Sequence, residues 1–199
     1  MANTSSPVSL HPTDALIIVD VQNDFLPGGS LAVPSGDEVI PKLNRYISAF
    51  VERDLPVFAT RDWHPPDHCS FKAQGGPWPP HCITGTPGAN FADALALPRD
   101  ATIVSKAQSR EADAYSGFEG TDLADRLRRA GIARLFIGGL ATDYCVLNTV
   151  KDARAQGFDV MLLVDAVRAV NVNPGDGEAA EAEMRQRGAR PLRIEHVAP

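Results

Sequence analysis

The chain has 199 residues, of which 44% are apolar and 22% are charged, a balance that is typical of a globular protein and excludes wholesale disorder. Its net charge of −6 argues against nucleic acid or an anionic membrane surface as the main partner. No apolar run approaches the ~20 residues that a membrane span needs. The first residues show no secretory signal, and three cysteines are too few for a disulfide framework. We therefore expect a cytoplasmic protein with a disordered N-terminal tail at 1–13 and a single domain at 14–199.

Short apolar runs alternate along the chain with segments of helical periodicity. The expected strands lie at 15–20, 57–60, 102–105, 134–139, 159–164 and 191–197. The expected helices lie at 39–51, with Ser35 and Asp37 as candidate caps, at 121–131, at 142–157, with Thr142 as N-cap, and at 177–188. Apolar strands separated by helices predict a doubly wound α/β domain, with a mostly parallel sheet and helices on both faces. Residues 62–100 show no periodicity, and a loop of that length is usually functional.

Three reactive side chains follow strands of this predicted sheet. Asp20 closes the first strand, Lys106 follows the third, and Cys145 lies shortly after the fourth. Because ligands of open α/β sheets bind outside the carboxyl ends of the strands, we expect the three to converge there. A helix N-terminus capped by Thr142 and a nearby ammonium would favour the thiolate of Cys145. The alternative is that Cys145 is a small core residue and that the two charged side chains serve a turn and the surface.

A second group of polar residues lies in the irregular segment. The chain has five histidines, and His64, His68 and His81 fall within 18 residues of one another, close to Asp62. A carboxylate with two imidazoles suits Zn²⁺, Mn²⁺ or Fe²⁺. The histidines could instead cap turns and stack on tryptophan. A structural zinc site formed by two histidines with Cys69 and Cys82 is the weaker alternative, because the usual close cysteine spacing is absent.

At the level of longer motifs, the chain resembles the nicotinamidase/pyrazinamidase branch of the isochorismatase-like cysteine hydrolases. The resemblance covers residues from about 14 to 196 and is carried by long motifs in a fixed order: ALIIVDVQNDFLPGGSL, RDWHPPDHCSF, GGPWPPHC, TPGANF, SKAQSREADAYSGFEG and GGLATDYCV. It implies the isochorismatase-like hydrolase fold. It also implies a catalytic triad with Cys145 as nucleophile, Asp20 as general base and Lys106 as its cationic partner.

The same resemblance assigns the remaining site residues. Asp62, His64 and His81 match metal ligands, and His68 lies where some relatives have a further ligand and others a supporting residue. The implied cofactor is one divalent metal, with zinc as the first candidate and iron or manganese as alternatives. Phe25 and Trp78 match residues that flank the pyridine ring of the substrate, with Tyr115 nearby. The Leu140–Ala141 bond matches a cis peptide that turns the amides of Ala141 and Cys145 toward the oxyanion.

The implied activity is the hydrolysis of nicotinamide, and of pyrazinamide, to the acid and ammonia, as a step of NAD salvage. The expected partner is this small-molecule substrate, with no nucleic acid and no membrane, and a homo-oligomer is left open. One rival is a metal-independent amidohydrolase of the same superfamily that acts on an N-carbamoyl or ureido substrate. Two others are a hydrolase in which a metal-bound water attacks and Cys145 is merely packed, and a non-catalytic binding module.

Overall fold

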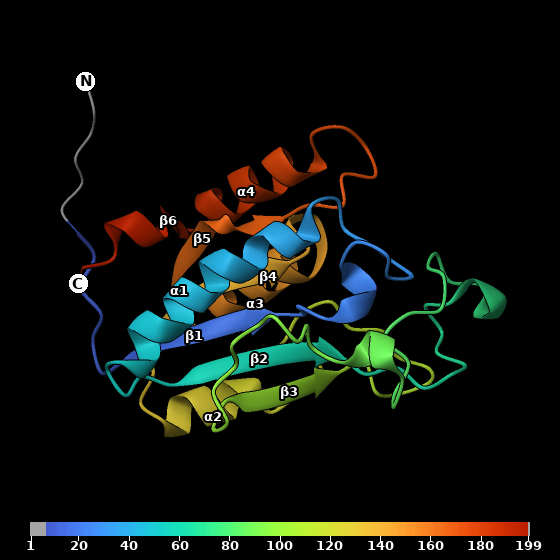
Figure 1. Ribbon diagram of the computed structural model, residues 1–199, viewed down its shortest axis with the longest axis horizontal. Coiled ribbons are helices and arrows are strands. Elements are labelled where there is room, and N and C mark those ends of the chain that lie inside the picture. The colour runs from blue at the N-terminus through green and yellow to red at the C-terminus, as the bar shows by residue number, and fades with distance from the viewer. Residues whose placement is uncertain (1–6, 199) are drawn as a thin grey trace.

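The computed structural model describes residues 7–198, and six strands form one sheet in its centre (Figure 1). The strands are β1 (Asp14–Val19), β2 (Val57–Asp62), β3 (Thr102–Lys106), β4 (Arg134–Leu140), β5 (Asp159–Arg168) and β6 (Arg190–Leu192). They lie in the order β3-β2-β1-β4-β5-β6, and every neighbouring pair is parallel. The predicted doubly wound α/β fold is therefore confirmed.

Helices cover both faces of the sheet. Helix α1 (Val39–Val51) packs on one face, while α2 (Leu123–Arg129), α3 (Leu147–Ala155) and α4 (Asp176–Gln186) pack on the other. The central strand β1 is buried along its whole length, with Leu16 and Ile18 in the core under α1 and Ile17 in the opposite core. Such burial on both faces explains why the strands are continuously apolar in the sequence.

The strand order reverses between β1 and β4, so a crevice opens at the carboxyl ends of these two strands. The long connection from β2 to β3 lies beyond the same ends and projects from the molecule on the right of Figure 1. It contains two short 3-10 helices, Lys72–Gln74 and Pro87–Ala89, and otherwise has the irregular structure that its sequence predicted. The topology thus brings the segment that carries three of the histidines to the edge where the strands end.

Several predicted boundaries are wrong. The segment after β4 begins with a π-helical turn, Thr142–Val146, in which Val146 N–H donates to Ala141 O at 3.0 Å. Ala141, and not Thr142, holds the N-cap position, and no side chain caps this turn. Ser35 and Asp37 likewise do not cap α1, because a 3-10 turn, Gly36–Glu38, leads directly into it. Cys145 therefore lies in a wider turn between β4 and α3, and not in the first turn of a regular α-helix.

The C-terminal part also differs from the sequence expectation. Strand β5 extends to Arg168, and the last strand is only Arg190–Leu192, because the chain then turns into the 3-10 helix Ile194–His196. Ile194 N–H donates to Asp165 Oδ2 at 3.1 Å, which holds this turn against the sheet.

Of the predicted disordered tail, residues 1–6 lie outside the described residues. The rest of that predicted tail is ordered, since Val8 exchanges backbone hydrogen bonds of 2.7 and 2.9 Å with His196 and Ala198. Among the residues that the structure describes, no helix is both long enough and apolar enough to cross a membrane.

The close approach of β4 to β1 depends on one glycine. Gly139 has φ +125° and is paired with Val19, and a Cβ atom at this position would lie 2.1 Å from the carbonyl oxygen of Val19. Only glycine allows both this backbone conformation and this contact. Gly139 therefore sets the separation of the two strands that border the crevice.

We expect Gly139→Ala to lower the free energy of unfolding by about 3 kcal/mol or more, because positive φ and a backbone clash add together. Urea denaturation measures this loss. Gly157 is the control: its φ is +90° but no atom lies within 4 Å of an added Cβ. Gly157→Ala should therefore cost only about 1 kcal/mol. Equal losses in the two variants would show that the contact with β1 is unimportant.

Candidate active site

The ends of three strands bring Asp20, Lys106 and Cys145 together, as the sequence predicted. Lys106 is the last residue of β3, Asp20 follows β1 with φ +50°, and Cys145 lies in the π-helical turn after β4. The ammonium Nζ of Lys106 lies 3.0 Å from Asp20 Oδ2 and 3.5 Å from Cys145 Sγ, and it donates to the carbonyl oxygen of Ala114 at 3.1 Å. All three side chains of this cluster are buried.

Burial opposes the ionisation of the thiol that the sequence led us to expect. Burial raises the pKa of Cys145 well above its ordinary value; Lys106 opposes this shift, but the nearby carboxylates of Asp20 and Asp62 add to it. Burial would lower the pKa of Lys106, yet the same two carboxylates raise it well above its ordinary value. Burial and the two carboxylates thus favour the thiol of Cys145 over the thiolate that the sequence led us to expect, while the ammonium of Lys106 favours the thiolate.

Burial also raises the pKa of Asp20, and the attraction of Lys106 only partly offsets this effect. A carboxylate with a raised pKa binds a proton more readily than an exposed aspartate does. Cys145 Sγ lies within 4.8 Å of an Asp20 carboxylate oxygen. The arrangement thus places a proton donor and a suitable acceptor side by side.

Asp62 connects this cluster to the histidines. Its Oδ1 accepts a short hydrogen bond from Lys106 Nζ, while its Oδ2 lies 3.6 Å from His64 Nε2 and 4.0 Å from His81 Nε2. Burial alone would raise the pKa of Asp62, but Lys106 and His64 outweigh it and hold the pKa well below the usual range. Asp62 is therefore ionised, and one carboxylate serves both groups of side chains.

Asp62, His64 and His81 fit a divalent metal ion. Their ligand atoms lie within 4.8 Å of one another, and all three residues are buried. The Nδ1 atoms of His64 and His81 lie 3.1 and 2.9 Å from backbone carbonyl oxygens, so each ring presents the lone pair of Nε2 to the cluster. Burial lowers the pKa of His81, which favours the neutral imidazole that a metal requires.

His68 lies beside this cluster but does not point into it. Its ring stacks on that of His64 at a centroid distance of 4.2 Å. Both of its ring nitrogens have partners within the protein, Ser70 Oγ at 2.7 Å and Ala112 O at 3.1 Å. In this arrangement His68 supports His64 and has no lone pair free for an ion.

The alternative of a structural zinc site has no support in the fold. Cys82 is buried in the core under α1, whereas Cys69 is partly exposed. Within the described part of the chain, neither cysteine belongs to a group of side chains that could share an ion. Both behave as packed or surface thiols.

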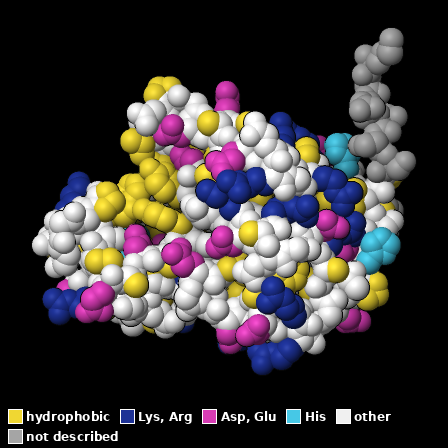
Figure 2. All heavy atoms as spheres, turned by 180° about the vertical axis from the view of Figure 1, so that it is seen from behind, with side chains coloured by type: hydrophobic (Ala, Val, Ile, Leu, Met, Phe, Trp, Pro, Cys, Tyr) yellow, Lys and Arg dark blue, Asp and Glu magenta, His cyan; other side chains and the backbone are white. Residues whose placement is uncertain are grey.

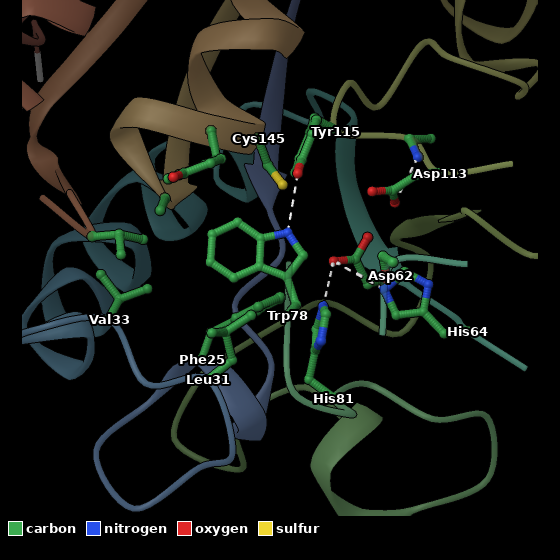
Figure 3. A pocket seen from close by; sticks show the side chains of 15 residues that line it. Phe25, Leu31, Val33, Asp62, His64, Trp78, His81, Asp113, Tyr115 and Cys145 are labelled. Atoms are coloured by element: carbon green, nitrogen blue, oxygen red, sulfur yellow. Dashed lines mark hydrogen bonds and ion pairs between the residues drawn. The ribbon is translucent and has the colours of Figure 1, made fainter. Parts of the chain in front are cut away.

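A pocket opens over these groups (Figure 3). Cys145 lies on one side of it and Asp62, His64 and His81 on another. The indole of Trp78 donates from Nε1 to the hydroxyl of Tyr115 at 3.0 Å. The predicted aromatic residues Phe25, Trp78 and Tyr115 all line the pocket, together with five apolar or aromatic residues that sequence reasoning missed: Leu31, Val33, Ala114, Tyr144 and Val170.

Seen from behind, the surface of the molecule is most apolar at the end that carries the β2–β3 connection. Figure 2 shows apolar side chains gathered at the end that carries the projecting loop, while basic and acidic side chains are interspersed over the remainder of that face.

The peptide bond between Leu140 and Ala141 is cis, as the family resemblance implied, and Ala141 lines the pocket beside Cys145.

Two buried polar residues near the site were not singled out from the sequence. Thr60 donates its hydroxyl to Asp20 Oδ1 at 2.7 Å. The side-chain amide of Gln22 accepts from Asp62 N–H at 2.8 Å and donates to the carbonyl oxygens of Asp62 and Ala89 at 2.8 and 2.9 Å. The only signal in the sequence was their position, one at the end of an apolar strand and the other two residues after Asp20.

We expect Lys106→Met to destabilise the fold by about 3–5 kcal/mol, because it leaves two buried carboxylates without their cation. Urea denaturation measures the change. In the double variant with Asp20→Asn, one of the two negative charges is also removed, so the loss should be smaller than in Lys106→Met alone. A double variant that is less stable than Lys106→Met would show that repulsion between the carboxylates is not the cause.

The chain is similar to known proteins in sequence and in fold. The model of the isochorismatase domain matches residues 14–196. The chain is 39% identical over 199 residues to the nicotinamidase of Escherichia coli, covering 89% of this chain and 93% of that protein. Pyrazinamidase of Pyrococcus horikoshii in complex with zinc is 53% identical, with a TM-score of 0.88 over 92% of this chain and 99% of the other.

PnC1 from L. infantum in complex with nicotinate is 39% identical, with a TM-score of 0.90 over 96% of this chain and 98% of the other. These likenesses extend over nearly the whole of each chain, so they concern the complete domain and not a shared motif. The chain therefore belongs to the isochorismatase family, where it groups with the nicotinamidase/pyrazinamidase members, and it is an amidohydrolase.

Proposed function

We propose that the protein hydrolyses nicotinamide to nicotinic acid and ammonia, and pyrazinamide to its acid, as a step of NAD salvage. The observation that carries this proposal is the pocket itself: a buried thiol paired with Lys106 lies opposite a two-histidine carboxylate cluster, between aromatic side chains suited to a flat ring. The names of the nicotinamidase relatives and the nicotinate complex of a structural neighbour point to the same substrate.

In the first half of the reaction, Asp20 takes the proton of the Cys145 thiol while Lys106 stabilises the negative charge. Sγ then forms a bond to the carboxamide carbon. The C–N bond breaks, ammonia leaves with the proton from Asp20, and a thioester remains on Cys145. The backbone N–H groups of Ala141 and Cys145 are the proposed donors to the oxyanion that forms at each attack.

In the second half, the same carboxylate takes a proton from water, whose oxygen attacks the thioester carbon. The C–S bond breaks, the proton returns to Sγ, and the acid is released. Phe25, Trp78 and Tyr115 would hold the ring during both attacks, so the carboxamide stays within reach of the sulfur. Lys106 remains protonated throughout and loses no proton to either step.

We further propose that Asp62, His64 and His81 hold one divalent ion, with zinc as the first candidate. Zinc lies about 2.0–2.2 Å from imidazole nitrogen and carboxylate oxygen, so separations of 3.6 and 4.0 Å between such ligand atoms suit a shared ion. When bound, the ion supplies a Lewis acid that the ring nitrogen of the substrate can ligate directly or through water. His68 is not part of this ligand set.

The deciding experiment measures ammonia and acid released from nicotinamide, from pyrazinamide and from an N-carbamoyl compound. We expect Cys145→Ser to retain less than about a tenth of the wild-type rate, since loss of a nucleophile normally costs orders of magnitude. Acid quenching of the wild type followed by peptide mass spectrometry should show a pyridine-carbonyl adduct on Cys145. No adduct in a single turnover, with Cys145→Ala still active, would mean that a metal-bound water attacks instead.

We expect His81→Ala to lower the affinity for Zn²⁺ by more than about 100-fold, and His68→Ala by about tenfold, because a supporting residue costs less than a ligand. Competition with a chromogenic chelator measures both constants without substrate. His11→Ala, at an exposed position outside the pocket, is the matched control and should bind Zn²⁺ as the wild type does. A larger loss for His68→Ala than for His81→Ala would reverse the two assignments.

A further inference from the structure

Thr60 binds Asp20 at two points. Its backbone carbonyl oxygen accepts from Asp20 N–H at 3.2 Å, and its hydroxyl donates to Asp20 Oδ1 at 2.7 Å. Both residues are fully buried, so neither contact exchanges with water. The backbone of Asp20 has φ +50°, in the left-handed region that few residues other than glycine adopt.

The two oxygens of Asp20 have different surroundings. Oδ1 holds the hydrogen bond from Thr60, whereas Oδ2 makes an ion pair with Lys106 Nζ at 3.0 Å. Among the buried side-chain nitrogens and oxygens that the structure describes, Asp20 Oδ2 is the one without a hydrogen bond. Its contact with Lys106 is an ion pair without a hydrogen bond, so Oδ2 has an acceptor site open to a proton.

A hydroxyl carries a single proton. While Thr60 donates that proton to Oδ1, one acceptor site of this oxygen is occupied, whereas Oδ2 has no hydrogen bond, so the acidic proton of a neutral Asp20 is favoured on Oδ2. Oδ2 is also the oxygen on the side of Lys106, whose ammonium lies 3.5 Å from Cys145 Sγ. The threonine thus distinguishes two oxygens that are chemically equivalent in a free carboxylate.

We propose that Thr60 is a positioning residue for catalysis: by donating to Oδ1, it reserves Oδ2 of Asp20 for the proton that passes from Cys145 to Asp20 and on to the leaving ammonia. This inference rests on the proposed function, because it assigns an atom to each proton transfer of that reaction. Thr60 does not line the pocket, and its hydroxyl donates to Asp20, so it would act through Asp20.

The methyl group of Thr60 has a separate, structural role. A Cβ atom at Gly117 would lie 2.7 Å from Thr60 Cγ2, so this methyl fills the space beside the glycine. Substitutions can therefore separate the two roles. Thr60→Val keeps the shape and loses the hydroxyl, Thr60→Ser keeps the hydroxyl and loses the methyl, and Thr60→Ala loses both.

The test compares kcat and KM for nicotinamide in these variants. We expect Thr60→Val and Thr60→Ala to lower kcat on the order of 10–100-fold with little change in KM, because the misplaced group acts in the chemical step. Thr60→Ser should restore kcat to within about fivefold of the wild type. If Thr60→Val does not fold, the comparison of Thr60→Ser with Thr60→Ala tests the hydroxyl instead, because both variants lack the methyl group.

Tyr46→Phe is the matched control, since Tyr46 also donates a hydroxyl to a buried carboxylate, Asp165 Oδ1, at 3.0 Å in the core under α1. It should lower the urea midpoint about as much as Thr60→Val does while leaving kcat unchanged. Wild-type kcat in Thr60→Val, or equal losses in Thr60→Ser and Thr60→Val, would overturn the inference.

A second readout needs no substrate. Alkylation of Cys145 by iodoacetamide, followed by peptide mass spectrometry, also requires loss of the thiol proton, so it should slow in Thr60→Val and recover in Thr60→Ser. If the wild type fails to hydrolyse nicotinamide, the proposed function is wrong, yet this alkylation series still decides the role of Thr60. Equal alkylation rates in the wild type and Thr60→Val would then overturn it.

Discussion

The buried ammonium of Lys106 lies among the carboxylates of Asp20 and Asp62, the thiol of Cys145 and the carbonyl oxygen of Ala114. Two carboxylates cannot both remain ionised in a protein interior unless a cation compensates them, and a buried cation equally requires its anions. Each group in this cluster therefore depends on the others. The charge state of the site, the pairing of thiol and base, and the orientation of Asp62 toward the histidines all follow from the position of this one nitrogen.

That position is a consequence of topology. Parallel strands end at one edge of the sheet, and the reversal of strand order between β1 and β4 leaves a gap there that side chains and a substrate can share. Lys106 and Asp62 end neighbouring strands in direct register, and Asp20 follows the strand on the other side of Asp62. Gly139 permits the close contact of β4 with β1, from which the chain turns toward Cys145. The fold thus supplies a rigid frame, and the irregular β2–β3 connection adds the histidines and Trp78.

Most of this frame could be predicted from the sequence, because strands and helices leave patterns among residues that are close together in the chain. Apolar strands, helical periodicity and the reactive residues that follow three of the strands were sufficient to predict a doubly wound sheet with Asp20, Lys106 and Cys145 at one edge. Boundaries were less well predicted where long-range contacts override local preference. Thr142 has the residue type of an N-cap, yet the chain enters a π-helical turn there. The 191–197 segment reads as a strand, yet it turns away after Leu192, where Asp165 holds the backbone of Ile194.

By itself, then, the sequence determined the fold class, the family and the residues that meet at the crevice, because strand periodicity and long motifs are properties of the chain order. Only the tertiary structure decided how these residues behave. Burial and two carboxylates raise the pKa of the Cys145 thiol, and one ammonium opposes them. His68 does not join the cluster of Asp62, His64 and His81 because Ser70 and Ala112 occupy both of its ring nitrogens. Protonation and hydrogen-bond partners depend on which groups surround a side chain in space, and residues distant in the sequence supply those groups.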